Sequence, residues 1–154
     1  MERRVDIISD THGYLAPELL RAIEGCDLLI HAGDITSESN YAELEVSVPV
    51  LRAVLGNNDG YYNYGPDVPR VNEFTYEGVR FSVAHYAEDL PLASSNVAVC
   101  GHTHRPRIDR VHGCLVINPG SHRCRVADGR PPSHGLWSRT AACYLPRSST
   151  YNFF

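Results

Sequence analysis

Acidic, amide and imidazole side chains follow one apolar run after another through the first two thirds of the chain. Each run ends in a short polar loop, and the side chains in these loops are of the types that bind hard or borderline divalent cations. In chain order they are Asp10, His12, Asp34, Asn57, His85, His102 and His104. Gathered in one place, such a set would be destabilising without a cation to neutralise and orient it. The set therefore predicts a metal centre.

Each of these motifs is weak when it is taken alone. A Gly-Asp pair is most often a turn, and an isolated histidine is usually an ordinary surface or core residue. Their combination is more specific, because alternate residues of an extended chain share a face. On that basis Asp10 with His12, and His102 with His104, are expected to point into one cavity.

The segments that must position these loops alternate between strand and helix patterns. Apolar runs predict strands at residues 5–8, 26–30 and 50–55, and the intervening segments predict helices at 17–24 and 39–46. This alternation indicates βαβ units in a mostly parallel sheet. Ligands of such sheets bind beyond the carboxyl ends of the strands, which is where the ligand candidates of this half lie.

The second half of the chain is richer in strands and hairpins. Strands are predicted at 72–76, 79–84, 97–100, 107–111, 114–117 and 141–145. Glu77-Gly78 and His112-Gly113 are predicted hairpin turns, and the Tyr-, Gly- and Pro-rich segment 60–69 is predicted to be a loop or lid. We therefore expect an α/β fold with two packed mixed β-sheets flanked by helices, a four-layer α/β/β/α sandwich. One domain would span residues 1–154, with an atypical tail from about residue 131.

Composition excludes several classes of function. The net charge of −4 argues against strong nucleic-acid binding, although a small nucleotide-like substrate stays compatible. The chain has no lysine, which excludes Schiff-base chemistry and a P-loop. No apolar run approaches the ~20 residues of a membrane helix, and the N-terminal sequence does not have the pattern of a secretory signal, so we expect a cytoplasmic protein. Among the five cysteines, Cys26 and Cys100 are expected to be buried free thiols.

The motifs resemble those of the calcineurin-like metallophosphoesterase superfamily. Its members carry, in order, D-x-H, G-D, G-N-H-D, a histidine and G-H-x-H. The corresponding segments here are DTH, GD, GNND, HY and GHTH, between Asp10 and His104, and NPGS follows. The small size and the NPGS segment are similar to the compact single-domain phosphodiesterase branch of that superfamily. From about residue 131 the resemblance fades.

The resemblance implies a pair of divalent metal ions. One ion would be held by Asp10, His12, Asp34 and His104. The other would be held by Asp34, Asn57, His85 and His102, with Asp34 bridging. Two such ions clamp a phosphoryl group and activate a bridging water for in-line attack on phosphorus. Mn²⁺ is the expected metal, with Ni²⁺, Fe²⁺, Zn²⁺ and Mg²⁺ as alternatives, because mixed histidine and carboxylate sites accept several metals.

The implied activity is hydrolysis of a small phosphodiester or nucleotide-like substrate, with Asp34, Asn57 and His102 as catalytic residues. Two alternatives stay open. One is a phosphomonoesterase, since a metal clamp alone does not choose between esters. The other is a non-catalytic scaffold, since a retromer subunit of this fold binds other proteins. A homo-oligomer is also compatible with the sequence.

Two positions depart from the superfamily pattern. Asn58 stands where many members have a histidine that donates a proton to the leaving group, a contribution of ~10²–10⁴-fold in rate. This departure favours slow turnover, a good leaving group, or protonation of the leaving group by water. Tyr86 stands where glycine commonly follows the metal-binding histidine, and it is expected to narrow the entrance. The carboxylate of Asp59 is expected to hold its loop rather than bind metal.

Other polar residues have plainer interpretations. His31 is expected to be buried at a strand end, and His112 and His134 to be solvated. Asn118 and Ser121 are expected to fix the NPGS loop. His122 and Arg123 follow that loop and are candidates for contacting a phosphate oxygen. For Tyr61, Tyr62 and Tyr64 we rank a packed loop or a subunit contact above stacking on an aromatic substrate group.

Overall fold

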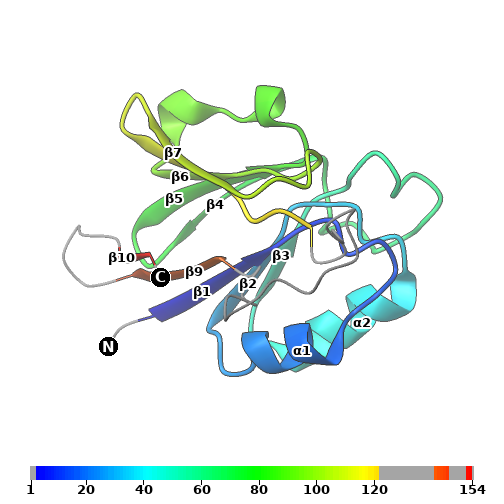
Figure 1. Cartoon of the computed structure of the whole chain (residues 1–154). Coiled ribbons are helices and arrows are strands. Elements are labelled where there is room, and N and C mark those ends of the chain that lie inside the picture. The colour runs from blue at the N-terminus through cyan, green and yellow to red at the C-terminus, as the bar shows by residue number, and fades with distance from the viewer. Residues whose placement is uncertain (1–2, 122–140, 146–151, 154) are drawn as a thin grey trace, which may run out of the picture.

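Three parallel strands organise the first half of the chain in the computed structural model, which describes residues 3–121, 141–145 and 152–153. The strands β1 (Arg3–Ile8), β2 (Leu28–His31) and β3 (Leu51–Ala53) pair side by side in that order. The helices α1 (Pro17–Ile23) and α2 (Glu38–Ser47) connect them and lie together on one side of this sheet (Figure 1). The predicted βαβ units are therefore present.

Local sequence explains where both helices begin. α1 has Pro17 in its first turn, where the missing N–H costs nothing, and it buries Leu19 and Ile23 on one face. α2 begins after Ser37, whose side chain accepts the backbone N–H of Asn40, an N-cap that typically contributes ~1 kcal/mol. The apolar side chains of both helices pack against the outer face of the first sheet.

The second sheet contains five strands in the order β4-β5-β6-β8-β7. These are β4 (Val71–Tyr76), β5 (Val79–Ala84), β6 (Val97–Val99), β7 (Arg107–Val111) and β8 (Cys114–Asn118). Both predicted hairpins form, and both turn pairs have positive φ, at 49° and 79° for Glu77-Gly78 and at 48° and 82° for His112-Gly113. The centre of the sheet, β5-β6-β8, is parallel, which the hairpin pattern did not predict.

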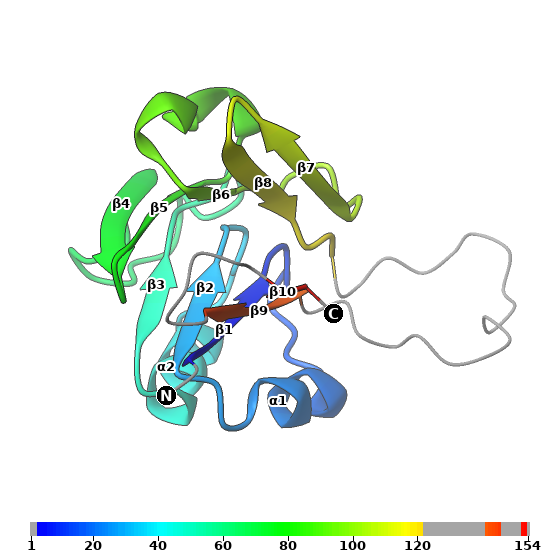
Figure 2. The same ribbon diagram turned by 90° about the vertical axis from the view of Figure 1, so that its left-hand side faces the viewer.

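That parallel centre requires a crossover between β5 and β6. Two short 3-10 helices, η1 (Ala87–Asp89) and η2 (Leu92–Ser94), lie in the crossover on the outer face of the second sheet (Figures 1 and 2). The prediction of two packed mixed sheets flanked by helical segments is thus confirmed. The layer outside the first sheet is α-helical, and the one outside the second is made of these two turns.

Two strands near the end of the chain widen the first sheet. β9 (Ala141–Leu145) pairs antiparallel with β1, and β10 (Asn152–Phe153) pairs antiparallel with β9. The first sheet is therefore mixed, in the order β10-β9-β1-β2-β3. The strand predicted at residues 141–145 is present. His134 and Trp137 lie outside the described residues.

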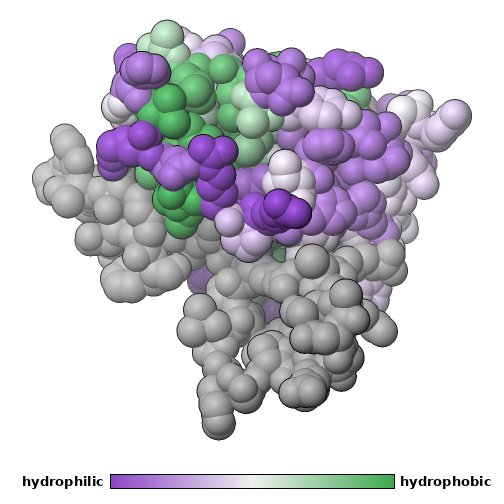
Figure 3. All heavy atoms as spheres, turned by 45° about the horizontal axis from the view of Figure 1, so that its top comes forward, coloured by the Kyte–Doolittle hydropathy of each residue, from purple (hydrophilic) through white to green (hydrophobic). Residues whose placement is uncertain are grey.

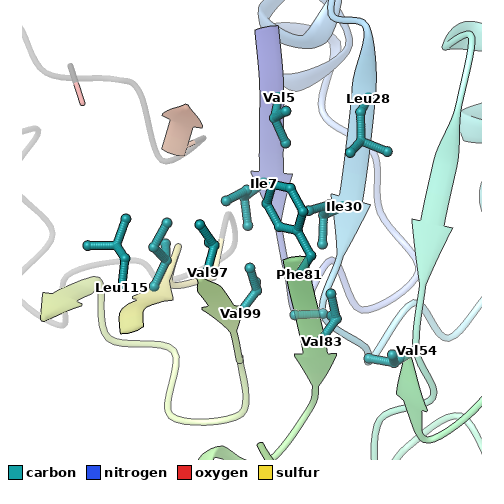
Figure 4. Packing of buried hydrophobic residues seen from close by; sticks show 12 residues of the cluster. Val5, Ile7, Leu28, Ile30, Val54, Phe81, Val83, Val97, Val99 and Leu115 are labelled. Carbon is teal, nitrogen blue, oxygen red and sulfur yellow. The ribbon is translucent and has the colours of Figure 1, made fainter. Parts of the chain in front are cut away.

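The main core lies between the two sheets. β1 and β2 supply Val5, Ile7, Leu28 and Ile30 to it, and β5, β6 and β8 supply the facing valines, leucine, isoleucine and Phe81. Figure 4 shows the ring of Phe81 between Ile7 and Ile30. Burying a side chain of this size contributes ~1.5–3 kcal/mol, so the core fixes the two sheets against each other. The loops at the strand ends are thereby held in fixed places.

Two further expectations can be compared with the structure. Cys26, Cys100 and Cys114 are buried free thiols, as expected for the first two. Burial raises the pKa of the Cys26 thiol to about 11, so this group stays protonated at neutral pH. Within the described part of the chain, none of the helices has the length and apolar character needed to cross a membrane.

Candidate metal centre

The loops at the carboxyl ends of five strands meet at one place between the two sheets. The loop after β1 carries Asp10 and His12, and the loop after β2 carries Asp34. Asn57 follows β3, His85 follows β5, and His102 and His104 follow β6. The structure brings all seven of these predicted ligands into one continuous cluster.

One side of the cluster is formed by Asp10 and two histidines. His104 Nε2 lies 3.1 Å from Asp10 Oδ1 and 3.3 Å from His12 Nε2. His12 Nε2 lies 3.7 Å from both Asp10 Oδ1 and Asp34 Oδ2. Asp10, His12 and His104 therefore offer three ligand atoms to one small space.

The other side is formed by His85, Asn57 and His102. The Oδ1 atom of Asn57 lies 3.0 Å from His85 Nε2 and 3.1 Å from His102 Nδ1. His85 Nε2 also lies 3.6 Å from Asp34 Oδ2, and 3.9 Å from Asp10 Oδ1. Because Asp34 Oδ2 is 3.7 Å from His12 on one side and 3.6 Å from His85 on the other, it lies between the two halves of the cluster.

Two of the converging atoms, His85 Nε2 and Asp10 Oδ1, are oriented as hydrogen-bond acceptors, as a cation requires. His85 Nδ1–H donates to the carbonyl of Ala32 at 2.8 Å, so Nε2 of the neutral ring carries a lone pair toward Asn57 Oδ1. Asp10 Oδ1 is buried and, within the described part of the chain, has no hydrogen-bond partner. Facing lone pairs repel unless a cation or proton lies between them, so these residues fit a divalent metal.

Five of the seven candidate ligands have left-handed backbone conformations. Their φ angles are 53° for Asp10, 48° for His12, 58° for Asp34, 67° for His102 and 57° for His104. Each such residue costs about 1–3 kcal/mol and typically occurs at functional sites. The sequence pattern predicted that Asp10 with His12, and His102 with His104, converge because alternate residues of a strand share a face. That reason was wrong, because both pairs lie in turns beyond the strand ends, and the turns rather than strand alternation set the direction of these side chains.

Two glycines allow the carboxylates to lie against the neighbouring loops. A Cβ on Gly56 would lie 2.1 Å from Asp34 Oδ1, and a Cβ on Gly101 would lie 2.7 Å from Asp10 Oδ2. Neither distance is compatible with a side chain, so these positions require glycine for close approach rather than for an unusual φ. The glycines of GNND and GHTH therefore set the positions of the two aspartates.

Asp59 holds the loop that carries Asp34, as expected from the sequence. Its carboxylate is 1% exposed, and Oδ2 accepts the backbone N–H groups of Asp34 (2.8 Å) and Gly56 (2.7 Å). Its Oδ1 accepts Thr36 N–H at 2.9 Å and the Tyr64 hydroxyl at 2.8 Å. Burial acts to raise the pKa of Asp59, but these hydrogen bonds outweigh it and hold the pKa below its ordinary value. Asp59 is thus a structural anion beside the site.

His31 connects the loop after β1 to the loop after β2. It is fully buried, with Nδ1 accepting the backbone N–H of Gly33 at 3.2 Å and Nε2 lying 3.0 Å from Thr11 Oγ1. Because Nδ1 accepts, the neutral ring carries its proton on Nε2, which donates to Thr11. Burial lowers the pKa of His31 from 6.5 to about 4. His31 is therefore a neutral link between two ligand loops.

Other polar side chains also position the ligand loops. Ser9 Oγ donates to Asp10 Oδ2 at 2.6 Å, and only its place beside Asp10 could have suggested this contact. Ser121 Oγ donates to the Asp10 carbonyl at 2.9 Å, and Asn118 Nδ2 donates to the Gly101 carbonyl at 2.8 Å, so these residues fix the loops as expected. His122 and Arg123 lie outside the described residues.

The tyrosine-rich loop packs through the buried Tyr64, whose ring centroid lies 5.2 Å from that of Tyr41 on α2. The rings of Tyr62 and Tyr64 stack with centroids 6.1 Å apart and an interplanar angle of 10°. Tyr61 is fully exposed, so it takes no part in this packing. Tyr86 lies instead at the metal centre, where its ring centroid is 4.6 Å from that of His102.

Sequence comparison shows a family that is consistent with this fold and this candidate metal centre. Residues 4–138 match the calcineurin-like phosphoesterase superfamily domain, so the chain belongs to that superfamily. A probable metallophosphoesterase of Methanothermobacter thermautotrophicus is 32% identical over 134 residues, 76% of this chain and 76% of the relative. A phosphodiesterase of Methanocaldococcus jannaschii is 30% identical over 138 residues, 76% of this chain and 82% of the relative.

Comparison of structures finds a similar fold in a protein that is not named a phosphoesterase. Vacuolar protein sorting 29 of Cryptosporidium parvum superposes with a TM-score of 0.72, covering 99% of this chain and 96% of the other, at 18% sequence identity. At that identity the likeness establishes the fold alone.

Proposed function

We propose that this protein is a phosphodiesterase that uses two divalent metal ions, Mn²⁺ being the favoured metal. The observation that carries the proposal is the convergence of carboxylate, amide and imidazole atoms around Asp34 Oδ2. On one side of it lies Asp10 Oδ1, which is buried and accepts no hydrogen bond within the described residues. The ligand sets would be those implied by the motifs. They are Asp10, His12, Asp34 and His104 for one ion, and Asp34, Asn57, His85 and His102 for the other.

The two ions, when bound, would supply Lewis-acid activation of the phosphoryl group and of the attacking water. The chain itself orients the ligands for them. Asn58 holds both oxygens of Asp34, and the Ala32 carbonyl fixes the ring of His85. Ser9 and the backbone N–H of His102 both donate to Asp10 Oδ2, which leaves Oδ1 turned toward the histidines. Asp34, Asn57 and His102 would be the groups nearest the reacting phosphoryl group.

Two observations favour a diester with a good leaving group. First, Asn58 stands where a proton-donating histidine is common, and its amide is already engaged with Asp34. A carboxamide is too weak an acid to transfer a proton at neutral pH, so the leaving oxygen must depart with little help from this position. Second, the Methanocaldococcus jannaschii relative is named a phosphodiesterase.

A scaffold is the second candidate function, and the fold likeness to vacuolar protein sorting 29 is the observation that favours it. The unpartnered buried oxygen of Asp10 favours metal binding, but a scaffold could also bind metal. Metal binding alone therefore does not distinguish an enzyme from a scaffold, whereas hydrolysis of a phosphoester does.

The test is an assay of metal-stripped protein reloaded with Mn²⁺, using bis(p-nitrophenyl) phosphate and p-nitrophenyl phosphate. We expect hydrolysis that depends on metal, faster for the diester, with two ions bound per chain by calorimetry. An Asp34→Asn variant serves as the matched inactive protein. If the folded, metal-loaded chain hydrolyses neither ester, the enzymatic proposal is wrong and the scaffold is favoured. Faster hydrolysis of the monoester would instead establish a monoesterase.

A further inference from the structure

A cavity of about 170 Å³ adjoins the metal centre on the outer side of the second sheet. Its floor is formed by the buried residues Cys100, Val116 and Asn118, at the ends of β6 and β8. The rings of Tyr86 and His102 form its wall toward the metal centre. Figure 3, which brings the side carrying η1 and η2 forward, shows apolar surface gathered on that side and bordered by hydrophilic residues.

The side chain of His102 belongs to both the cavity and the metal centre. Its Nδ1 lies 3.1 Å from Asn57 Oδ1, among the candidate ligands, while the same residue lines the cavity. Tyr86 lies beside it, 4.6 Å from His102 and 5.4 Å from His85 between ring centroids. A phosphate held among the ligands would therefore have one of its ester oxygens within reach of this cavity.

The size of the cavity fits a single ring. A protein cavity of ~150 Å³ is known to bind benzene, so about 170 Å³ accommodates one monocyclic group and is too small to enclose a whole nucleoside. The apolar part of the lining is formed by the ring of Tyr86, the methyl of Ala87 and the side chain of Val116. Apolar walls of this kind favour an uncharged, planar occupant.

The polar groups of the cavity are largely engaged within the protein. Asn118 Nδ2 donates to the Gly101 carbonyl at 2.8 Å and to Thr103 Oγ1 at 3.0 Å, and its Oδ1 accepts Gly120 N–H at 2.9 Å. Arg107 at the rim is paired with Asp109. With Glu88 also at the rim, the entrance carries charges of both signs and does not select an anion. A second phosphate is therefore a poor occupant.

We propose that this cavity receives one ester group of the substrate, and that this group is a single uncharged ring attached to the phosphate. The inference rests on the proposed function, because it places the phosphate of the same substrate at the metal centre. It narrows the substrate class to phosphodiesters that carry a monocyclic aryl or similar ring.

The test measures binding rather than turnover, using phenylphosphonate and methylphosphonate, which are not hydrolysed. Calorimetry on the Mn²⁺-loaded protein is expected to show phenylphosphonate binding at least about tenfold more tightly, because only its ring fills the cavity. Ala87→Phe, which fills the cavity from the exposed turn η1, should reduce this ratio to about one. Ala93→Phe is the matched control, since Ala93 is exposed on η2 and does not line the cavity. The control should keep the wild-type ratio.

The outcomes separate this inference from the proposed function. Equal affinity for the two phosphonates in the wild-type protein, or an unchanged ratio in Ala87→Phe, overturns the cavity assignment even if the protein hydrolyses diesters. A preference for phenylphosphonate that Ala87→Phe abolishes supports the assignment even if turnover is not detected. If Ala87→Phe does not fold, NMR of the wild-type protein decides. Phenylphosphonate, unlike methylphosphonate, should shift the backbone amides of Ala87 and Val116, and unshifted amides would overturn the assignment.

Discussion

Asn58 holds the carboxylate of Asp34 with two hydrogen bonds, one to each oxygen. Its backbone N–H donates to Oδ1 at 2.9 Å and its side-chain amide donates to Oδ2 at 2.7 Å. Asp34 Oδ2 is the atom that lies between the two halves of the metal centre. The asparagine at this position therefore does more than replace a proton donor, because it orients the aspartate that is proposed to bridge the two ions.

Removing the amide should weaken metal binding. We expect Asn58→Ala to raise the Kd for Mn²⁺ about tenfold or more, the typical effect of deleting a group that orients a metal ligand. Calorimetry on metal-stripped protein measures this change. Asn72→Ala is the control, because the Asn72 amide makes a long 3.5 Å contact with the Ala53 carbonyl, which is not part of the site. An unchanged Kd in Asn58→Ala would show that the contact does not orient Asp34.

A histidine at position 58 should supply the missing proton donor while losing the amide contact. The comparison is therefore Asn58→His against Asn58→Ala, since neither variant has the amide. We expect kcat/KM of Asn58→His to be higher by ~10²-fold or more for a diester with an alkyl leaving group, and nearly equal for a p-nitrophenyl ester. Nearly equal rates for both substrates would mean that another group already protonates the leaving oxygen.

Asp59 should contribute to stability rather than to metal affinity alone. Its carboxylate accepts hydrogen bonds from the backbone of Asp34, Gly56 and Thr36, and an asparagine would turn an N–H₂ group toward some of these donors. We expect Asp59→Asn to lower the free energy of unfolding by about 2–4 kcal/mol. Urea unfolding of metal-stripped protein at pH 7 measures it, with exposed Asp67→Asn as the control. A loss below ~1 kcal/mol would contradict the structural role.

His31 should make stability depend on pH below neutrality. Its pKa of about 4 in the fold lies below the ordinary value of 6.5, so between these values the unfolded chain binds the extra proton. The free energy of unfolding therefore falls as the pH drops through this window, and His31 should account for about 2 kcal/mol of loss between pH 7 and pH 5. At pH 7 and above this contribution does not change.

The measurement is urea unfolding of metal-stripped wild-type and His31→Gln protein at pH 7 and pH 5. The variant should lose about 2 kcal/mol less than the wild type between the two pH values. His112→Gln is the control, because His112 is exposed in a hairpin turn and should leave the wild-type pH dependence unchanged. Equal pH dependence in wild type and His31→Gln would show that His31 titrates normally.

Much of the fold was predictable because strand and helix patterns are local. The strand at 79–84 and the turn at Glu77-Gly78 follow from alternation and turn residues alone. The parallel pairing of β5, β6 and β8 was not predictable in this way, because it depends on which distant segments meet. Sequence periodicity does not carry that information.

The ligand types of the candidate site were predictable, but their geometry was not. Asp10 and His12 were expected to share a face of a strand, whereas the structure turns the chain sharply at both, with φ near 50°. The contact of Ser9 with Asp10 and the link that His31 makes to Thr11 depend on packing between loops. Such contacts leave no periodic pattern in the sequence, so only the folded structure places them.

Gly101 offers the sharpest test of the close packing in the metal centre. A Cβ at this position would lie 2.0 Å from Ser9 Oγ and 2.7 Å from Asp10 Oδ2. Ser9 can rotate away, but Asp10 is a candidate ligand and must shift to make room. We therefore expect Gly101→Ala to weaken Mn²⁺ binding by ~10-fold or more, because ligand geometry tolerates little displacement. Gly60→Ala is the matched control, since a Cβ there meets nothing within 4 Å and Gly60, like Gly101, has no positive φ. Tight metal binding in Gly101→Ala would show that Asp10 is not held where a metal needs it.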